Sequence, residues 1–436
     1  MSQTTLRVQE ARQPLQGHVS APGDKSISHR ALLLGAIAGG ETRITGLLAA
    51  DDTTATARCL RALGVGMGEL DAPAVTVFGV GLRGLRSPQA DLDCGNSGTT
   101  MRLLMGILAG QDFSARLIGD ESLSRRPMDR VAQPLRQMGA EIAGQTERCR
   151  PPVAVRGGAL RGISYVSPVA SAQVKSALVL AGLYADGETS VTEPYQSRDH
   201  TERMLASFGA QIRTEGLTTA VRGGELTGRS IDVPGDLSAA AFMLVAGLLV
   251  GESWVSVARV GVNPTRTGVL DILRAMGADI VTSHEETAGG EPLATVTASG
   301  SWLHGGEIGA EIVPRLIDEL PVLCVAAAVA EGTTRISGAQ ELRVKESDRL
   351  EAMATELTKM DARVTEQPDG LVIEGVERLR GGEVSGRGDH RVAMALAVAG
   401  LVADGETVIT DSGGIATSFP GFVTTMRRLG ADIRVG

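Results

Sequence analysis

The sequence predicts an α/β protein of two inside-out domains, each built from three β-α-β-α-β-β repeats with buried parallel helices. Three observations support this prediction. A polar helix start, an Ala/Leu/Val helix and a glycine stop recur six times, with the stop glycines 64 to 81 residues apart. A second, amphipathic helix follows in each copy and ends in a shared tag such as MGADI at Met276. The chain's 436 residues are enough for two such domains.

The domain organisation follows from two matching segments, SAPGDKS at Ser20 and DVPGDLS at Asp232. We expect the chain to cross between the domains there, near Pro22 and Pro234. Residues 24–234 then form one three-repeat domain, and residues 1–23 and 235–436 form the other. EETAGGE, residues 285–291, is expected to be a surface loop. The positive ends of the buried helices would converge on the cleft between the domains, where we expect the active site.

The first buried helix begins in an unusual segment, PGDKSISHR at residues 22–30. The first N–H groups of a helix lack internal partners and carry the positive end of the helix dipole. Lys25 and Arg30 add full positive charge beside Ser26, so the segment favours an anion site. The alternative is that Asp24 or Ser26 only caps the helix while the two cations lie in water.

Composition narrows the function classes. A net charge of −9 and an aromatic content of 3% argue against nucleic-acid binding. No apolar run is long enough to span a bilayer, and the N-terminus lacks the apolar core of a signal peptide, so we expect a cytoplasmic protein. The four cysteines lie far apart in the sequence, at Cys59, Cys94, Cys149 and Cys324. Their spacing predicts reduced thiols, and we expect neither a metal site nor a cofactor.

Further polar residues lie near the other helix starts and in two basic segments, residues 124–127 and 343–349. They include Asn96, Gly98, Thr99, Arg102, Ser171, Gln173, Lys175, Asp318, His390 and Arg391. In an acidic protein such a local basic cluster suits a small ligand with several anionic groups. The alternative is that each arginine only pairs with a neighbouring carboxylate, as Arg349 could with Asp348 or Glu346.

Two carboxylates are candidates for proton transfer, Asp318 and Glu346. Each could equally be structural, since an aspartate that opens a helix is a common N-cap. The sequence has no Gly-x-Ser-x-Gly elbow, Walker loop or zinc signature. Acid–base chemistry on anionic small molecules, without a metal, is what these residues indicate.

Five motifs resemble those of the 5-enolpyruvylshikimate-3-phosphate synthase family: PGDKSISHRALLL, GNSGTTMR, SAQVKSA, LRVKESDRL and GDHRVAMA. The resemblance covers essentially the whole chain. It implies the same two-domain fold and a transferase of the shikimate pathway, which leads to chorismate and the aromatic amino acids. The implied reaction moves the enolpyruvyl group of phosphoenolpyruvate onto the 5-hydroxyl of shikimate 3-phosphate, through a tetrahedral intermediate, with release of phosphate.

The resemblance also assigns residues, with residues 24–234 mainly on the shikimate 3-phosphate side and the other domain mainly on the phosphoenolpyruvate side. Asp318, Glu346 and Lys25 would be catalytic. The shikimate 3-phosphate site would contain Lys25, Ser26, Arg30, Ser171, Ala172, Gln173, Arg198, Asp318 and Lys345. The phosphoenolpyruvate site would contain Lys25, Gly98, Arg126, Gln173, Arg349 and Arg391. We expect a monomer whose partners are these two substrates, and glyphosate competes with phosphoenolpyruvate in sensitive members of the family.

Two positions depart from the best-known form of the family. Ala172 stands where a second serine often binds the phosphate, and Arg198 would supply that contact instead. Thr417 stands where a phosphoenolpyruvate-binding lysine is often found.

Two other functions are compatible with the same fold. One is the related enolpyruvyl transferase that acts on UDP-N-acetylglucosamine, which typically has Asn after the motif lysine where this chain has Ser26. That relative also carries a mobile-loop cysteine, which the segment 117–127 lacks. The other is a non-catalytic anion-binding protein of the same fold. Retention of both Asp318 and Glu346 argues against it, because binding anions does not require these carboxylates.

Overall fold

The computed structural model describes residues 4–436, which divide into two compact units, each with its own hydrophobic core. Unit 1 consists of residues 4–22, Pro234–Glu286 and Pro292–Gly436, and unit 2 of Gly23–Val233 and Thr287–Glu291. The long boundaries fall beside the two expected crossovers. The short segment 287–291 was expected to belong with its sequence neighbours in the other domain.

That short segment is the tip of a β-hairpin, so the expected surface loop at residues 285–291 was wrong. Strand β16 runs over Asp279–Ala288, and β17 begins again at Glu291 and ends at Ser299. Gly289 and Gly290 form the turn, both with positive φ angles of 60° and 87°. The tip is held within unit 2, because Glu291 is buried against His200 with the Nδ1 and Oε1 atoms 2.7 Å apart.

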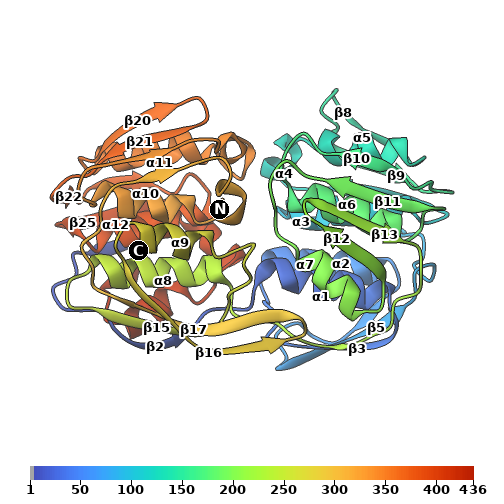
Figure 1. Cartoon of the computed structure of the whole chain (residues 1–436), viewed down its shortest axis with the longest axis horizontal. Coiled ribbons are helices and arrows are strands. Elements are labelled where there is room, and N and C mark those ends of the chain that lie inside the picture. The colour runs from blue at the N-terminus through green and yellow to red at the C-terminus, as the bar shows by residue number, and fades with distance from the viewer. Residues whose placement is uncertain (1–3) are drawn as a thin grey trace. The chain divides into compact units, whose positions relative to one another are not determined.

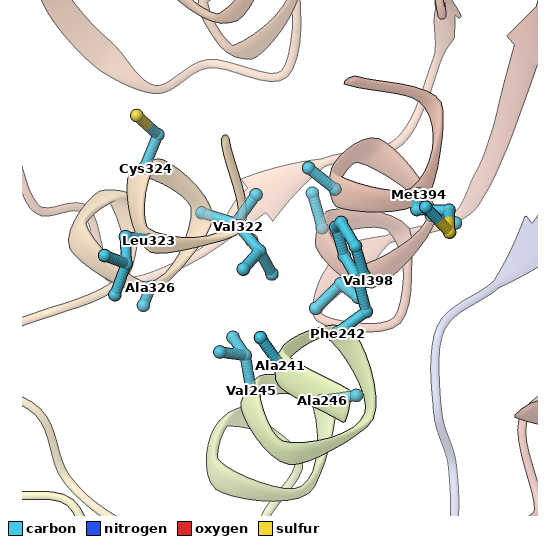
Figure 2. Packing of buried hydrophobic residues seen from close by; sticks show 14 of the residues in the cluster. Ala241, Phe242, Val245, Ala246, Val322, Leu323, Cys324, Ala326, Met394 and Val398 are labelled. Atoms are coloured by element: carbon cyan, nitrogen blue, oxygen red, sulfur yellow. The ribbon is translucent and has the colours of Figure 1, made fainter. Parts of the chain in front are cut away.

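Each unit has three helices that are buried on nearly every side, as their all-round apolar sequences predict. They are α1 (Lys25–Ile37), α3 (Gly98–Ala109) and α6 (Ala172–Gly182) in unit 2, and α8 (Leu237–Leu249), α10 (Leu320–Ala328) and α12 (His390–Gly400) in unit 1. Within each unit these helices lie inside and the sheets lie outside them (Figure 1). The packing in unit 1 brings Phe242 of α8 close to Val398 of α12 and to side chains of α10 (Figure 2).

The second helix of each repeat is amphipathic and keeps one face toward solvent. These helices are α2 (Asp51–Ala62), α5 (Asp129–Gln137), α7 (His200–Ser207), α9 (Gly268–Ala275), α11 (Arg349–Lys359) and α13 (Phe422–Arg428). The second residue of each tag, directly after the helix, has a positive φ angle, as a C′ position requires. In five copies it is glycine, for example Gly277 at 96°, and in the fifth copy Asp361 takes this conformation at 62°.

Six four-stranded sheets share one topology, a parallel pair followed by two antiparallel partners. Written with the parallel pair first, the orders in unit 2 are β14-β3-β5-β4, β6-β7-β9-β8 and β10-β11-β13-β12. In unit 1 they are β2-β15-β17-β16, β18-β19-β21-β20 and β23-β25-β1-β26. Strand β2 (Gln16–Ser20) precedes α1 in sequence but pairs with β15 (Trp254–Gly261) of the fourth repeat. Strand β14 (Ser230–Asp232) precedes α8 but pairs with β3 (Gly39–Thr45) of the first. The first and fourth repeats thus exchange their first strands, and each matching PGD segment links an exchanged strand to the helix that follows it.

The remaining strands complete the sheets. In unit 2 they are β4 (Gly66–Met67), β5 (Ala74–Val80), β6 (Leu92–Asp93), β7 (Ser114–Ile118), β8 (Glu141–Gln145), β9 (Arg150–Arg156), β10 (Ser164–Val166), β11 (Glu188–Thr192), β12 (Gln211–Glu215) and β13 (Thr218–Arg222). In unit 1 they are β1 (Leu6–Gln9), β18 (Glu307–Ile308), β19 (Thr333–Ile336), β20 (Arg363–Gln367), β21 (Gly370–Glu374), β23 (Glu383–Ser385), β25 (Glu406–Thr410) and β26 (Ile433–Val435). A short pair, β22 (Leu379–Arg380) and β24 (Ala403–Asp404), short helix α4 (Glu121–Arg125) and three 3-10 turns, η1 (Val313–Arg315), η2 (Gln340–Val344) and η3 (Gly413–Thr417), lie between them.

Among residues 4–436, no helix has the length and apolar character needed to cross a membrane.

Candidate active site

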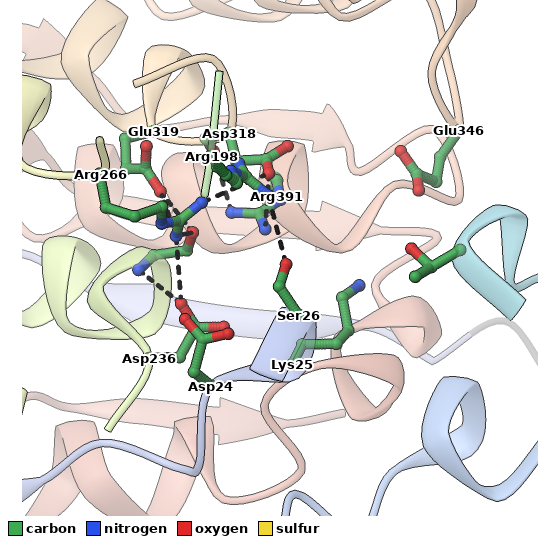
Figure 3. Close-up of polar contacts among 12 residues, drawn as sticks. Asp24, Lys25, Ser26, Arg198, Asp236, Arg266, Asp318, Glu319, Glu346 and Arg391 are labelled. Carbon is green, nitrogen blue, oxygen red and sulfur yellow. Dashed lines mark hydrogen bonds and ion pairs between the residues drawn. The ribbon is translucent and has the colours of Figure 1, made fainter. Parts of the chain in front are cut away.

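The start of α1 in unit 2 carries a cation that is not in bulk water. Asp24 caps the helix by accepting the Ile27 N–H at 2.8 Å, as one of the two sequence interpretations requires. Lys25, however, points away from the cap (Figure 3). Its Nζ lies 3.0 Å from Oδ2 of Asp52 on α2. Only 15% of the Lys25 side chain is exposed. The helix start therefore presents a partly desolvated ammonium group at the positive end of the helix dipole.

Arg30 lies one turn further along α1 and is only 3% exposed. Its guanidinium donates to Thr201, to the Ser26 carbonyl and to Ser176, so it ties α1 to α6 and α7. Burial lowers the pKa of Arg30 to about 10, which leaves it charged at neutral pH. Its assignment as a substrate ligand stays a prediction, because these contacts also give it a structural role.

Arg198 precedes α7 and brings a second guanidinium to the start of α1. Its Nη1 lies 3.4 Å from the Ser26 hydroxyl. The structure therefore brings Arg198 to Ser26, the sequence neighbour of Lys25, from 172 positions away.

The start of α3 provides two further cations around a glycine. Arg126 donates to the Asn96 side chain at 2.6 Å, and Arg102 donates to Oε1 of Gln173 at 2.7 Å. A Cβ atom built on Gly98 would lie 2.7 Å from Nη1 of Arg102 and 3.4 Å from Nη1 of Arg126. The absence of a side chain at Gly98 therefore leaves room for both guanidinium groups beside the helix N-terminus.

The start of α6 is joined to that of α3 through Gln173, which also donates to the Thr99 hydroxyl at 2.9 Å. Ser171 is the N-cap of α6, and its hydroxyl oxygen accepts the Val174 N–H at 3.4 Å. A hydroxyl that accepts in this way still has its own proton to donate outward. Ala172, the first residue of α6, adds no polar group.

In unit 1 the central group is Arg349, which is 1% exposed and contacts three carboxylates. Its Nε lies 2.8 Å from Asp389, its Nη2 2.7 Å from Glu346 and its Nη1 3.3 Å from Asp318. Burial alone would lower the pKa of Arg349, but the three carboxylates together raise it above its usual value. Arg349 does pair with a sequence neighbour, Glu346, as the structural alternative proposed, but it pairs with two distant carboxylates as well.

Asp318 is the carboxylate at which several arginines converge. Besides Arg349, Arg391 has its Nη2 3.6 Å from Asp318, and Nη1 of Arg266 lies 4.0 Å away (Figure 3). Asp318 does not cap α10, because Glu319 occupies the N-cap position. The expectation that Asp318 opens the helix was therefore off by one residue, and its carboxylate is turned toward the arginines.

Two further residues of unit 1 were singled out in the sequence, the predicted ligand Lys345 and the departing residue Thr417. Burial lowers the pKa of Lys345, while Asp318 acts in the opposite direction. The Thr417 hydroxyl donates to the Gly414 carbonyl at 2.7 Å within η3, so it satisfies the backbone of its own turn.

Sequence reasoning missed several charged residues that hold these groups. They are Asp52, Asp236, Arg266, Glu319 and Asp389. Arg266 is 3% exposed and has Nη2 within 3.4 Å of Asp236 and 3.3 Å of Glu319. Two of the five carried a usable signal: Asp236 matches Asp24 in the repeated PGD segment, and Asp389 precedes α12 in GDHR. Both cap their helices by accepting a backbone N–H, from Ser238 and Arg391 respectively.

The two clusters have complementary chemical abilities. Unit 2 offers hydroxyl donors, a lysine and three arginines at helix N-termini, which suits a phosphate group. Unit 1 offers two carboxylates held among arginines, which suits proton transfer on an anionic ligand.

Comparison with known proteins agrees with this chemistry. Residues 9–426 match the family model for EPSP synthase, described as 3-phosphoshikimate 1-carboxyvinyltransferase. A relative from Gloeobacter violaceus named 3-phosphoshikimate 1-carboxyvinyltransferase is 56% identical over 417 residues, which cover 95% of this chain and 96% of the relative. A relative of the same name from Citrifermentans bemidjiense is 53% identical over 413 residues, covering 94% of this chain and 96% of the relative.

A solved structure gives the same result for the fold. The EPSP synthase from Acinetobacter baumannii matches with a TM-score of 0.88 and 46% sequence identity, covering 99% of this chain and 100% of that one. The names of these relatives support the first interpretation of the sequence and not the UDP-N-acetylglucosamine alternative. The chain belongs to the EPSP synthase (3-phosphoshikimate 1-carboxyvinyltransferase) family.

Proposed function

We propose that the polar residues at these helix starts serve the reaction of the family, the transfer of the enolpyruvyl group of phosphoenolpyruvate to the 5-hydroxyl of shikimate 3-phosphate. The observation that carries the proposal is the environment of Asp318. With Arg349 at 3.3 Å and Arg391 at 3.6 Å, the charge of the Asp318 carboxylate is balanced by two cations. The phosphate and carboxylate of phosphoenolpyruvate would take over these arginines, and Asp318 would then be a stronger base toward the attacking hydroxyl.

The binding roles divide between the two clusters. Shikimate 3-phosphate would be held by Ser26, Arg30, Ser171, Gln173, Arg198 and Lys345 in addition to Lys25, with Ala172 lining the site. Phosphoenolpyruvate would be held by Arg126, Gln173, Arg349, Arg391 and Lys25, with Gly98 leaving room for it. These assignments rest on the family resemblance together with the charge, burial and helix-terminal position of each residue.

The chemical steps need three proton transfers. In the addition, Asp318 takes the proton of the 5-hydroxyl while the oxygen of that hydroxyl bonds to C2 of phosphoenolpyruvate. The methylene carbon takes a proton from Glu346 or Lys25. In the elimination, the group that protonated the methylene carbon takes a proton back from the methyl group, the C–O bond to phosphate breaks with its electron pair leaving on the phosphate, and Lys25 stabilises the departing phosphate. The fixed cations supply charge stabilisation at each stage without reorganisation of solvent.

A coupled assay tests the proposal. The chain should release phosphate when given phosphoenolpyruvate and shikimate 3-phosphate together, and none with either alone. A parallel reaction with UDP-N-acetylglucosamine as acceptor separates the main proposal from its rival. Binding of both anions without any turnover would instead support the non-catalytic alternative.

We further propose that the protein works as a monomer in the cytoplasm, with no nucleic-acid or membrane partner. All four cysteines are free and buried, which suits a reducing compartment. Light scattering coupled to gel filtration should give a mass near the 45.2 kDa of one chain.

A further inference from the structure

Glu193 is a buried carboxylate that none of the proposed steps uses. It follows strand β11 directly and is only 4% exposed. A carboxylate is costly to bury unless its charge and its hydrogen-bonding capacity are satisfied. Its partners therefore indicate why the chain keeps it there.

The two oxygens of Glu193 contact two different loops. Oε1 accepts the backbone N–H of Ser171, the N-cap of α6, at 2.9 Å. Oε2 accepts the hydroxyl proton of Ser197 at 2.8 Å. Ser197 immediately precedes Arg198, so one carboxylate joins the loop that carries Ser171 to the loop that carries Arg198.

Lys175 balances the charge of this bridge. Its Nζ lies 2.8 Å from Oε2 of Glu193 and 2.8 Å from Oε1 of Glu202. Burial lowers the pKa of Lys175, but the two glutamates outweigh this effect and raise it, so the ammonium stays charged. Without Lys175, the negative charge of Glu193 would lie uncompensated beside a loop that is proposed to bind phosphate.

We propose that Glu193 is a positioning residue for shikimate 3-phosphate, an inference that rests on the proposed function. By holding both loops, it sets the distance between the Ser171 hydroxyl and the Arg198 guanidinium. By accepting the Ser171 N–H, it fixes the backbone from which the Ser171 hydroxyl projects.

Glu202 offers a matched control. It is buried like Glu193, at 6% exposure, and it contacts the same ammonium group. It also accepts the hydroxyl proton of Thr219 at 3.3 Å, and among residues 4–436 none of its hydrogen bonds is to Ser171 or Ser197. Glu193→Gln and Glu202→Gln thus remove the same charge from the same lysine, and only the first disturbs the bridge between the loops.

The experiment compares these two variants with the parent enzyme. Calorimetry measures the dissociation constant of shikimate 3-phosphate for the enzyme alone, and steady-state kinetics measure KM for each substrate. Glu193→Gln should weaken shikimate 3-phosphate binding at least tenfold and change KM for phosphoenolpyruvate less than threefold. Glu202→Gln should change the dissociation constant less than threefold at a comparable melting temperature.

Ser197→Ala provides a second measurement if Glu193→Gln does not fold. It removes only the contact between Glu193 and the Arg198 loop, and should weaken shikimate 3-phosphate binding about threefold with KM for phosphoenolpyruvate unchanged. Equal losses in Glu193→Gln and Glu202→Gln, or parent-like binding in both Glu193→Gln and Ser197→Ala, would overturn the inference. A parent enzyme that binds shikimate 3-phosphate but shows no turnover would instead count against the proposed function.

Discussion

Lys25 and Asp52 form an ion pair of 3.0 Å at the start of α1, with 15% and 12% of their side chains exposed. The aspartate comes from the first turn of α2, so two helix starts are joined by one contact. Asp52 balances the charge of the ammonium group, and an anionic substrate would have to compete with Asp52 for it. Because the ammonium group is partly buried, its contact with a substrate anion would be stronger than the same contact in water.

Lys25→Met is expected to lower kcat at least a hundredfold, about 2.7 kcal/mol in the barrier. Methionine keeps the length of the side chain but removes the charge proposed to face both substrates. Turnover of phosphoenolpyruvate and shikimate 3-phosphate is the measurement, with circular dichroism to verify folding. Lys359→Met removes a lysine that is 46% exposed and should keep parent activity. A Lys25→Met enzyme with a third of the parent rate would show that the assignment is wrong.

Asp318→Asn tests the proposed base. The amide keeps the shape of the side chain but cannot accept the hydroxyl proton, so kcat should fall by two orders of magnitude or more, as for loss of a general base. KM for shikimate 3-phosphate should change by less than a factor of five. Asp404→Asn, at an exposed carboxylate paired with Arg378, serves as the control. Unchanged kcat in Asp318→Asn would assign the base to another group.

Gly98→Ala is expected to weaken glyphosate binding at least tenfold, about 1.4 kcal/mol. The added methyl would lie 2.7 Å from Nη1 of Arg102, so the guanidinium must move and the space beside Arg126 becomes shorter. Glyphosate is longer than phosphoenolpyruvate and should be affected more than the substrate. Inhibition of parent and variant is measured against phosphoenolpyruvate. A parent that glyphosate does not inhibit, or a variant that is equally sensitive, would rule out Gly98 as the residue that limits ligand length.

Asp361→Gly should stabilise unit 1 by about 0.5 kcal/mol. Asp361 is exposed and has a φ angle of 62°, a backbone conformation that costs a residue with a side chain roughly 1 to 2 kcal/mol. Glycine removes this cost, but its greater conformational entropy in the unfolded chain offsets part of the stabilisation. Denaturant unfolding followed by circular dichroism measures the change. The reverse test is Gly209→Ala at a φ angle of 90°, which should destabilise unit 2. A less stable Asp361→Gly protein would mean that the carboxylate has a stabilising contact of its own.

His29 predicts a loss of stability in acid. Burial lowers the pKa of His29 to about 3, whereas in the unfolded chain the value is about 6.5. Between these values the unfolded chain binds a proton that the folded protein does not, so stability falls as the pH falls from 6.5 toward 3. The contribution between pH 7 and pH 5 is about 2 kcal/mol.

His29→Asn should remove that part of the pH dependence, since asparagine can retain the contact with the Thr56 hydroxyl, which lies 2.7 Å from Nδ1 of His29. Unfolding free energies of parent and variant at pH 7 and pH 5 provide the comparison. His304→Asn, at an exposed histidine, should leave the pH dependence as in the parent. Equal pH dependence in the parent and His29→Asn would contradict the prediction.

Much of the fold could be predicted because its signals are local. A cap, an all-round apolar helix and a glycine stop each depend on a few adjacent residues, and their sixfold recurrence identified the repeats. The positive φ angles of Gly277 and Asp361 follow from their position after a helix. The hairpin at 285–291 could not be told from a loop, because a Gly-Gly turn between charged residues is typical of both.

By itself, then, the sequence determined the repeat architecture, the helix starts and the set of residue types available for chemistry. Only the tertiary structure decided which of those residues meet. Lys25 and Asp52 are 27 positions apart, Arg266 and Glu319 are 53 apart, and Glu193 binds Ser171 from 22 positions away. Such pairs form between separate elements, so their geometry depends on how helices and sheets pack, and no periodicity or cap in the chain encodes that distance.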